Sequence, residues 1–281
     1  MTTLVWFRND LRLADNPALF DACADKDAAV VAVYLVASDQ YREHGEGDRR
    51  LGFLRRNLES LQTALAELKI PLWVAPAPRF ADAASALLSI ARATEAKELY
   101  FNAEYPLNEA RRDRAVVRAC SATGVACHVR HGDVMQPPGE ISKDDGEPYR
   151  VFTPFKRRWQ QRSSRAERTP LGVPQPRLAL PRMEIPAPEP LENLPATAAD
   201  PDWPAGEAAA RRRLEDFLAT RINRYHEERD YPARPATSRL SPYLSMGVLS
   251  AREAYHAAEE TGPAATSWLN ELIWREFYRH V

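Results

Sequence analysis

Five short hydrophobic runs in the first 135 residues predict β-strands. They lie at residues 3–7, 28–36, 71–75, 98–101 and 125–129, and the second run, AAVVAVYLV, is apolar at every position. Strands with apolar side chains on both faces are typical of a parallel sheet that helices cover from both sides. The runs therefore predict a sheet that is buried on both faces.

The segments between these runs carry the periodicity of amphipathic helices. The clearest is residues 49–68, where leucines recur at intervals of three and four residues. Such spacing places the leucines on one face of a helix. Strands that alternate with helices of this kind favour the doubly wound α/β class with a parallel sheet.

The composition changes after the α/β pattern ends. Residues 170–204 hold 10 of the 23 prolines, and from residue 207 onward the pattern is only helical, with helices expected at 207–220, from 250 to about 261, and from about 267 to the end. Ser250, followed three residues later by Glu253, predicts a helix start. We therefore expect an α/β domain at 1–135, an extended connector at 136–205 and a helical domain beginning at 206.

Composition narrows the classes of protein that need consideration. The chain has 281 residues, 44% hydrophobic and 27% charged, which excludes extensive disorder. No apolar run is long enough to span a membrane and the N-terminus does not have the pattern of a cleavable leader, so we expect a cytoplasmic protein. The net charge of −1 neither requires nor excludes nucleic acid as a partner. Cys23, Cys120 and Cys127 fit buried thiols better than a disulfide framework or a zinc site.

Common catalytic motifs are absent from the sequence. There is no GxGxxG after the first strand, no Walker loop, no GxSxG and no HExxH, and the six histidines do not group at metal-ligand spacing. Hydrolase and dehydrogenase chemistry therefore receive little support.

Two C-terminal segments carry side chains suited to ligand binding. The run TSRLSPYL at 237–244 gathers hydroxyls and an arginine that could hold phosphate oxygens, although a capped turn explains it equally well. In the last helix, one arc holds Leu269, Leu272, Ile273 and Phe277, with Glu276 interrupting it. The opposite arc could stack on a flat aromatic ligand and hydrogen-bond its edge, and it holds Trp268, Glu271, Trp274, Arg275 and Tyr278.

Read as strings, these residues resemble the DNA photolyase and cryptochrome family, and most of all bacterial pyrimidine-dimer photolyases. The matching strings are LVWFRNDLRLADNPAL at the start, YRVFTPF at 149–155 with Trp159, RYHEERDYP at 224–232, TSRLSPYL at 237–244 and WLNELIWREFYRH at 268–280. The resemblance implies an α/β domain with an antenna pigment, a long connector and a helical domain that holds FAD. This organisation coincides with the one predicted from periodicity.

The resemblance also implies roles for individual residues. Glu271 would hydrogen-bond a flipped pyrimidine dimer, Trp274 would stack on it, and Arg229 and Arg275 would face the DNA backbone, with Tyr278 beside them. A folate antenna, 5,10-methenyltetrahydrofolate, would contact Asn108 and Glu109, with His44 as a weaker candidate. The implied FAD ligands are Tyr225, Thr237, Ser238, Arg239, Leu240, Ser241 and Trp268.

The activity implied is light-driven repair of pyrimidine dimers in UV-damaged DNA, by a monomer. Two alternatives stay open: a cryptochrome-type photoreceptor that signals, and an autonomous α/β ligand-binding module. Antenna identity and lesion type, pyrimidine dimer or (6-4) product, also stay open. Because family members continue well past the WREFYRH string, we expect the 281-residue chain to be an incomplete and inactive portion of such a protein.

Overall fold

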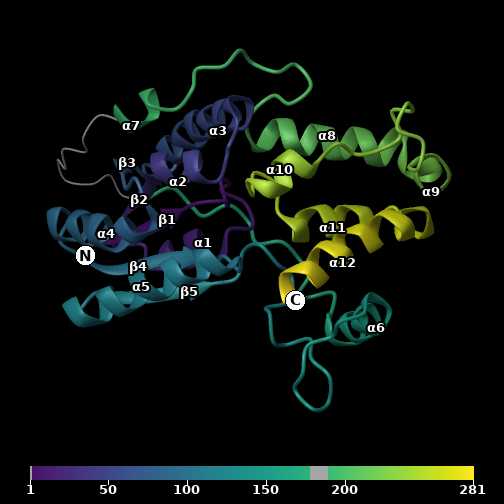
Figure 1. Ribbon diagram of the computed structural model, residues 1–281, viewed down its shortest axis with the longest axis horizontal. Helices are drawn as coiled ribbons and strands as arrows, with labels where there is room; N and C mark the ends of the chain where they lie inside the picture. Colours follow the sequence, from purple (N-terminus) through teal and green to yellow (C-terminus); the bar gives the residue numbers. More distant parts are fainter. Residues whose placement is uncertain (1, 178–188) are drawn as a thin grey trace. The chain divides into compact units, whose positions relative to one another are not determined.

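The computed structural model describes residues 2–177 and 189–281, which form two units (Figure 1). The first, here called the α/β unit, contains residues 1–132 and 171–206. The second, the helical unit, contains residues 133–170 and 207–281.

A five-stranded parallel sheet forms the centre of the α/β unit. Its strands lie in the order β3-β2-β1-β4-β5, and every neighbouring pair is parallel. This confirms the predicted doubly wound α/β class, and each of the five hydrophobic runs is a strand. The strands are β1 (Thr2–Phe7), β2 (Ala29–Val36), β3 (Leu72–Pro76), β4 (Ala96–Asn102) and β5 (Ala126–Arg130).

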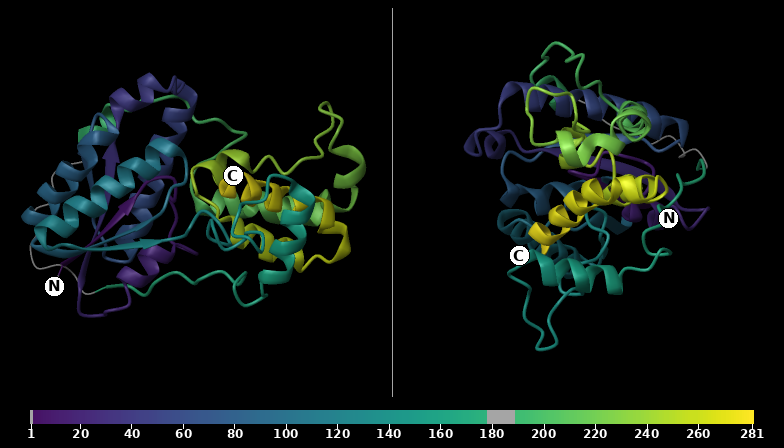
Figure 2. Two further views of the ribbon diagram at one scale, coloured as in Figure 1. Left: turned by 60° about the horizontal axis from the view of Figure 1, so that its bottom comes forward. Right: turned by 90° about the vertical axis from the view of Figure 1, so that its right-hand side faces the viewer.

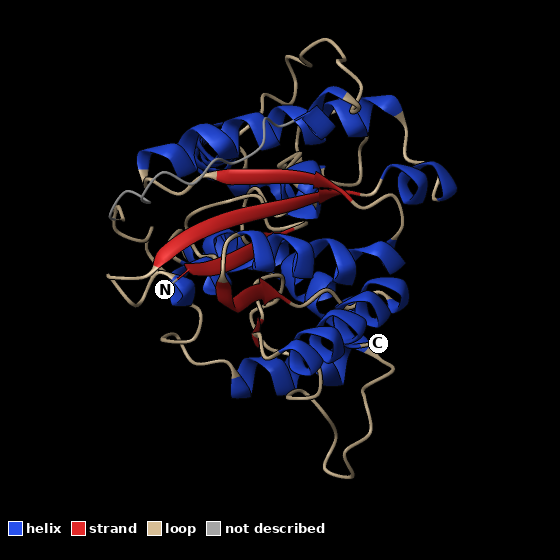
Figure 3. Cartoon of the chain, turned by 90° about the vertical axis from the view of Figure 1, so that its left-hand side faces the viewer, coloured by secondary structure: helices blue, strands red, loops and turns tan. Residues whose placement is uncertain are grey.

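Helices cover both faces of the sheet (Figure 3). Helices α4 (Ala83–Ala93) and α5 (Leu107–Thr123) bury side chains such as Leu87 and Val116 against Leu4 and Trp6 of β1. The alternate residues of the strands are buried as well, because α1 (Pro17–Ala22) packs on β1 and β4 and α3 (Asp48–Glu67) packs on β3. Helix α2 (Ser38–Glu43) follows β2.

The strand order fixes where polar groups can meet. The chain runs outward from β1 to β3 and then returns to the other side of β1 with β4. In sheets of this type, ligands bind at the carboxyl ends of the two strands between which the order reverses. The loops after β1 and β4 therefore meet at the site that the topology favours.

The predicted connector at 136–205 is divided between the two units, which corrects the expected organisation. Its later part packs on the α/β unit: Arg177 donates to the carbonyls of Cys23 and Ala28, both at 2.7 Å, and Leu191 and Leu194 are buried. Helix α7 (Glu189–Glu192) lies in this part. The part of the predicted connector at residues 178–188 lies outside the described residues.

The earlier part of that segment belongs to the helical unit because α6 (Phe152–Arg162) buries Phe155 and Trp159 completely. Figure 2 shows α12 (Thr266–His280, yellow) beside α6 (teal). The predicted helices at 207–220, 250–261 and 267–281 are all present. The remaining helices of this unit are α8 (Glu207–Thr220), α9 (Tyr225–Glu228), α10 (Ser241–Ser245) and α11 (Ala251–Glu259), with single 3₁₀ turns at Ile222–Arg224 and Pro263–Ala265.

Helix α11 begins as its sequence predicts, because the Ser250 side chain accepts a hydrogen bond from the Glu253 amide at 2.8 Å. On α12, Leu272, Ile273 and Phe277 are buried as predicted. Among the described residues, no helix is long and apolar enough to cross a membrane.

Glu276, which interrupts the apolar arc of α12, is fully buried. Its carboxylate accepts hydrogen bonds from the backbone amides of Met135 and Gln136 at 3.0 to 3.1 Å. The interruption therefore has a structural reason: Glu276 binds the loop that precedes α6.

Candidate functional site

The segment predicted to hold flavin phosphates lies open to solvent at the start of α10. Thr237, Arg239 and Ser241 are exposed, Ser238 is partly exposed, and only Leu240 is buried. Arg239 has a φ of 53°, in the left-handed region that non-glycine residues rarely adopt. Backbone strain of this kind is concentrated at functional sites. The segment therefore combines solvent-exposed hydroxyl groups with a strained backbone at Arg239.

Tyr225 and Trp268, the other predicted flavin contacts, both pack against Phe217 of α8. The ring centroids lie 5.7 Å and 5.3 Å from that of Phe217, and both side chains are more than nine-tenths buried. Burial and the nearby Glu271 carboxylate raise the pKa of Tyr225. In the described structure these two aromatic residues therefore pack α9 and α12 against α8.

Glu271, predicted to bind a lesion, and Arg229, predicted to bind the DNA backbone, contact each other. The Arg229 guanidinium donates a hydrogen bond to Glu271 and lies 5.7 Å from the Tyr225 ring centroid. Both charged side chains remain about one-third or more exposed, at 34% and 42%. The residue predicted to bind the lesion and the residue predicted to bind the DNA backbone therefore form one solvent-accessible ion pair.

Trp274 is half-buried and lies among other aromatic rings. Its indole stacks on Phe152, with centroids 3.7 Å apart and ring planes 8° from parallel. Tyr278, the last predicted DNA contact, is 70% exposed and lies 5.7 Å from the same indole. Helix α12 therefore presents Trp274, Glu271 and Tyr278 at the surface of the helical unit.

Arg275 is placed differently from its predicted role at the DNA backbone. Its guanidinium donates to the carbonyl and the carboxylate of Asp133, and Arg279 pairs with the same carboxylate at 2.8 Å. The Arg275 side chain is only 19% exposed. In this structure Arg275 binds the loop before α6, because Asp133 provides an anion within reach.

The predicted antenna contacts lie in the α/β unit. Asn108 is exposed and Glu109 partly exposed in the first turn of α5, while exposed His44 ends α2. The His44 ring packs edge-on against Phe80, with centroids 6.0 Å apart, and its Nε2 lies 2.9 Å from Gln40 Nε2. Asn108 and Glu109 follow β4 in the chain, and His44 follows β2.

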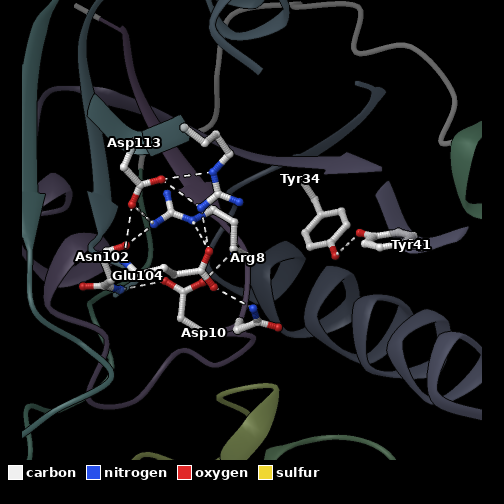
Figure 4. A network of polar contacts seen from close by, with 9 residues as sticks. Arg8, Asp10, Tyr34, Tyr41, Asn102, Glu104 and Asp113 are labelled. Atoms are coloured by element: carbon white, nitrogen blue, oxygen red, sulfur yellow. Dashed lines mark hydrogen bonds and ion pairs between the residues drawn. The ribbon is translucent and has the colours of Figure 1, made fainter. Parts of the chain in front are cut away.

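Sequence reasoning missed a buried charge network at the reversal of strand order. Arg8 follows β1, and Glu104 follows β4. Arg112 of α5 donates to Glu104 at 2.5 Å and to Asp113 at 2.8 Å, while Arg8 lies 3.7 Å from Glu104 and 3.5 Å from Asp113 (Figure 4). Two guanidiniums and two carboxylates therefore neutralise each other at this edge.

Further polar contacts lie near these charges (Figure 4). Asn102, at the end of β4, donates to Asp10 at 2.6 Å, and the hydroxyls of Tyr34 and Tyr41 lie 3.0 Å apart. Burial raises the pKa of both tyrosines. The sequence held a usable signal, since FRND and FNAE put polar residues directly after buried strands.

Glu104 shows how strongly the network favours charge. Burial alone acts to raise the pKa of Glu104, but the guanidiniums of Arg112 and Arg8, together with hydrogen bonds from Arg112 and Asn9, outweigh it and lower the pKa to about 2. The carboxylate therefore stays ionised at any pH near neutral. Arg8 and Arg112 also lie over the Trp6 ring, at 4.1 and 4.8 Å from its centroid.

Similarity to known proteins covers the whole chain. The chain is 38% identical to the deoxyribodipyrimidine photo-lyases of Salmonella typhimurium and Escherichia coli over 289 residues, which is 100% of this chain and 60% of each relative. It therefore spans about 60% of the length of these curated relatives.

Solved structures agree with the sequence comparison. A bacterial class III photolyase from Agrobacterium tumefaciens matches with a TM-score of 0.85 and 29% identity, over 99% of this chain and 58% of that one. A cryptochrome from Synechocystis matches with a TM-score of 0.80 and 26% identity, over 99% and 60%. The family model for DNA photolyase matches residues 3–177, more than half of the chain. The resemblance of the sequence strings is thus confirmed, and the chain belongs to the DNA photolyase family.

Proposed function

We propose that the full protein repairs pyrimidine dimers in UV-damaged DNA with light, as a monomer in the cytoplasm. Family membership and relatives named deoxyribodipyrimidine photo-lyase support this activity. The observation that carries it is on α12, where a half-buried indole, Trp274, lies one helical turn from the part-exposed carboxylate of Glu271. An aromatic face beside a hydrogen-bond acceptor suits an extruded base.

FAD would be held at its phosphates by the segment 237–241. The open hydroxyls of Thr237, Ser238 and Ser241 and the exposed Arg239 supply donors for phosphate oxygens, so the residues present fit this part of the group. Tyr225 and Trp268, whose rings pack against Phe217, would also contact FAD. When bound and reduced, FAD supplies the light-excited electron for ring splitting.

DNA would be bound by the exposed groups around α12. Trp274 would stack on the extruded dimer, Glu271 would accept hydrogen bonds from its base edges, and Arg229 and Tyr278 would contact the backbone. Arg275 would join them only by exchanging Asp133 for a phosphate. Flipping costs less for a dimer than for normal bases because the damaged step is already poorly stacked.

A folate antenna, 5,10-methenyltetrahydrofolate, is proposed for the α/β unit at His44, Asn108 and Glu109. The exposure of His44 and Asn108 supports this placement, because their polar atoms are accessible to a ligand. The ion pair with Arg112 and the low pKa of Glu104 keep a carboxylate charged at this edge of the sheet.

Substituting Trp274 tests the lesion site. Trp274→Ala should weaken binding of a dimer-containing oligonucleotide by about 1 to 3 kcal/mol, the usual value of a base stack on an aromatic ring, and leave undamaged DNA nearly unchanged. The measurement is a fluorescence-anisotropy titration of both oligonucleotides. An equal loss on both would contradict a stacking role at the lesion.

A cryptochrome-type photoreceptor is the second candidate, because the Synechocystis cryptochrome shares this fold over 99% of the chain. The two candidates differ in their selectivity for damage. A photolyase should prefer dimer-containing DNA over undamaged DNA of the same sequence, whereas a signalling protein needs no such preference. The same titration with the unsubstituted full protein therefore separates them.

A further inference from the structure

We propose that Phe152 is a positioning residue for Trp274: its ring covers one face of the indole and leaves the opposite face for a stacked base. The proposal rests on the proposed function, since it concerns how α12 receives a lesion. It adds a residue from a different element, at the first position of α6.

The geometry of the pair leaves no room for another ring between them. The centroids lie 3.7 Å apart and the planes are 8° from parallel. At this separation the carbon atoms of the two rings are in van der Waals contact. A base can therefore not enter on the Phe152 side of the indole.

Phe152 is held in place by the helix that it begins. One turn later, Phe155 is fully buried, and its ring packs against Phe277 and His280 of α12 with centroids 5.2 and 5.1 Å away. Trp159, also fully buried, anchors the next turn against Tyr255. Because α6 is fixed to the helix that carries Trp274, Phe152 forms a rigid backing for the indole.

The indole of Trp274 stays partly exposed, so its other neighbours do not enclose it. Phe277 meets the ring edge-on, at 80°, and Tyr278 lies 5.7 Å away, tilted by 24° and 70% exposed. Neither lies as close or as nearly parallel as Phe152. An indole fixed on one side binds a base with less loss of side-chain freedom, because its orientation is already set.

The test replaces the flat ring but keeps an apolar side chain of similar length. Phe152→Leu should lower the preference of the chain for dimer-containing over undamaged oligonucleotide by about two- to tenfold, the factor that corresponds to one aromatic pair. Tyr149→Leu is the matched control, because Tyr149 lies three residues earlier and packs edge-on against Phe155. It should leave the preference unchanged.

A double-substitution cycle shows whether Phe152 acts through Trp274. In a Trp274→Ala chain, Phe152→Leu should have no further effect on the preference. An effect of equal size in both backgrounds, or equal effects of Phe152→Leu and Tyr149→Leu, would overturn the proposal. A gain in affinity for both oligonucleotides would also overturn it, since Phe152 would then occupy the place of the base.

Tryptophan fluorescence separates failure of this inference from failure of the proposed function. Phe152→Leu should shift the emission of the chain that contains Trp274 and leave a Trp274→Phe chain unchanged. If the unsubstituted full protein shows no preference for the dimer, the proposed repair function fails, and the fluorescence measurements still test the contact between Phe152 and Trp274. A shift that persists in the Trp274→Phe chain overturns the positioning role.

Discussion

The guanidinium of Arg229 donates a hydrogen bond to the carboxylate of Glu271, so two residues with different expected roles in DNA binding neutralise each other before any DNA is bound. The hydrogen bond to Glu271 and the charge of its carboxylate raise the pKa of Arg229, which keeps the guanidinium ionised. An exposed pair of this kind adds little to stability, about 1 kcal/mol at most. We therefore expect the pair to affect DNA binding more than folding stability.

This pairing predicts that the two residues are coupled in DNA binding. Arg229→Gln should weaken binding to dimer-containing DNA more strongly in the unsubstituted chain than in a Glu271→Gln chain, because the uncompensated carboxylate repels phosphate only when it is present. Titrations of the four variants give the coupling. Equal losses in both backgrounds would show that the residues act independently.

The network at the edge of the sheet predicts sensitivity to acid. The pKa of Glu104 is about 2 in the folded chain against an ordinary 4.5, so its contribution is complete above pH 4.5 and is lost as pH falls toward 2. That contribution is about 3 kcal/mol, from about 1.4 kcal/mol per unit. Urea unfolding of the chain at pH values across this window measures it.

Substitution of Glu104 tests this prediction, with an exposed carboxylate as the matched control. Glu104→Gln should remove this pH dependence and destabilise the chain at neutral pH, because Arg112 and Arg8 lose a buried anion. Glu59→Gln, which breaks a pair with Arg55 at a side chain 49% exposed, should change little. Identical acid profiles for Glu104→Gln and the unsubstituted chain would refute the assignment.

The raised pKa of Glu276 leads us to expect a dependence of stability on pH opposite to that of Glu104. Burial is the main cause that raises the pKa of Glu276 from 4.5 to about 7, against the Arg275 charge and the amides of Gln136 and Met135. The folded chain therefore holds a proton that the unfolded chain releases, so stability falls as pH rises from 4.5 to 7, by about 3 kcal/mol at most. The free energy of unfolding should decline over this range in the unsubstituted chain and stay flatter in Glu276→Gln. Parallel curves would contradict the prediction.

From the contacts of Arg177 we expect the segment after residue 170 to stabilise the α/β unit. Its guanidinium donates to the carbonyls of Cys23, Asp25 and Ala28, and it is 5% exposed. Arg177→Gln leaves buried acceptors without donors, so we expect a loss of about 2 to 4 kcal/mol in unfolding free energy. Thermal or urea unfolding measures the loss, with Arg49→Gln, 87% exposed, as a control that should have no measurable effect. A change as small as that of the control would show that the segment is only a linker.

The sequence alone was sufficient to predict those elements whose structure depends on residues close together in the chain. The strand runs, the helix at 207–220 and the Ser250 cap follow from side chains that are neighbours along the chain. The family strings were sufficient for the fold class and the family, because they are spread along the whole chain. The predicted roles of Thr237, Ser238 and Arg239 remain proposals.

The contacts that set the site join residues far apart in the sequence. Three contacts show this: Phe152 stacks on Trp274 across 122 positions, Arg275 pairs with Asp133 across 142, and Arg8 lies beside Glu104 across 96. No periodicity relates such pairs, because their proximity results from how α6, α12 and the strand ends pack. The sequence alone thus determined the elements, the fold class and the residue types at the candidate site. Only the tertiary structure decided that Arg275 meets an aspartate, that Glu276 binds backbone amides and that Trp274 has one face covered.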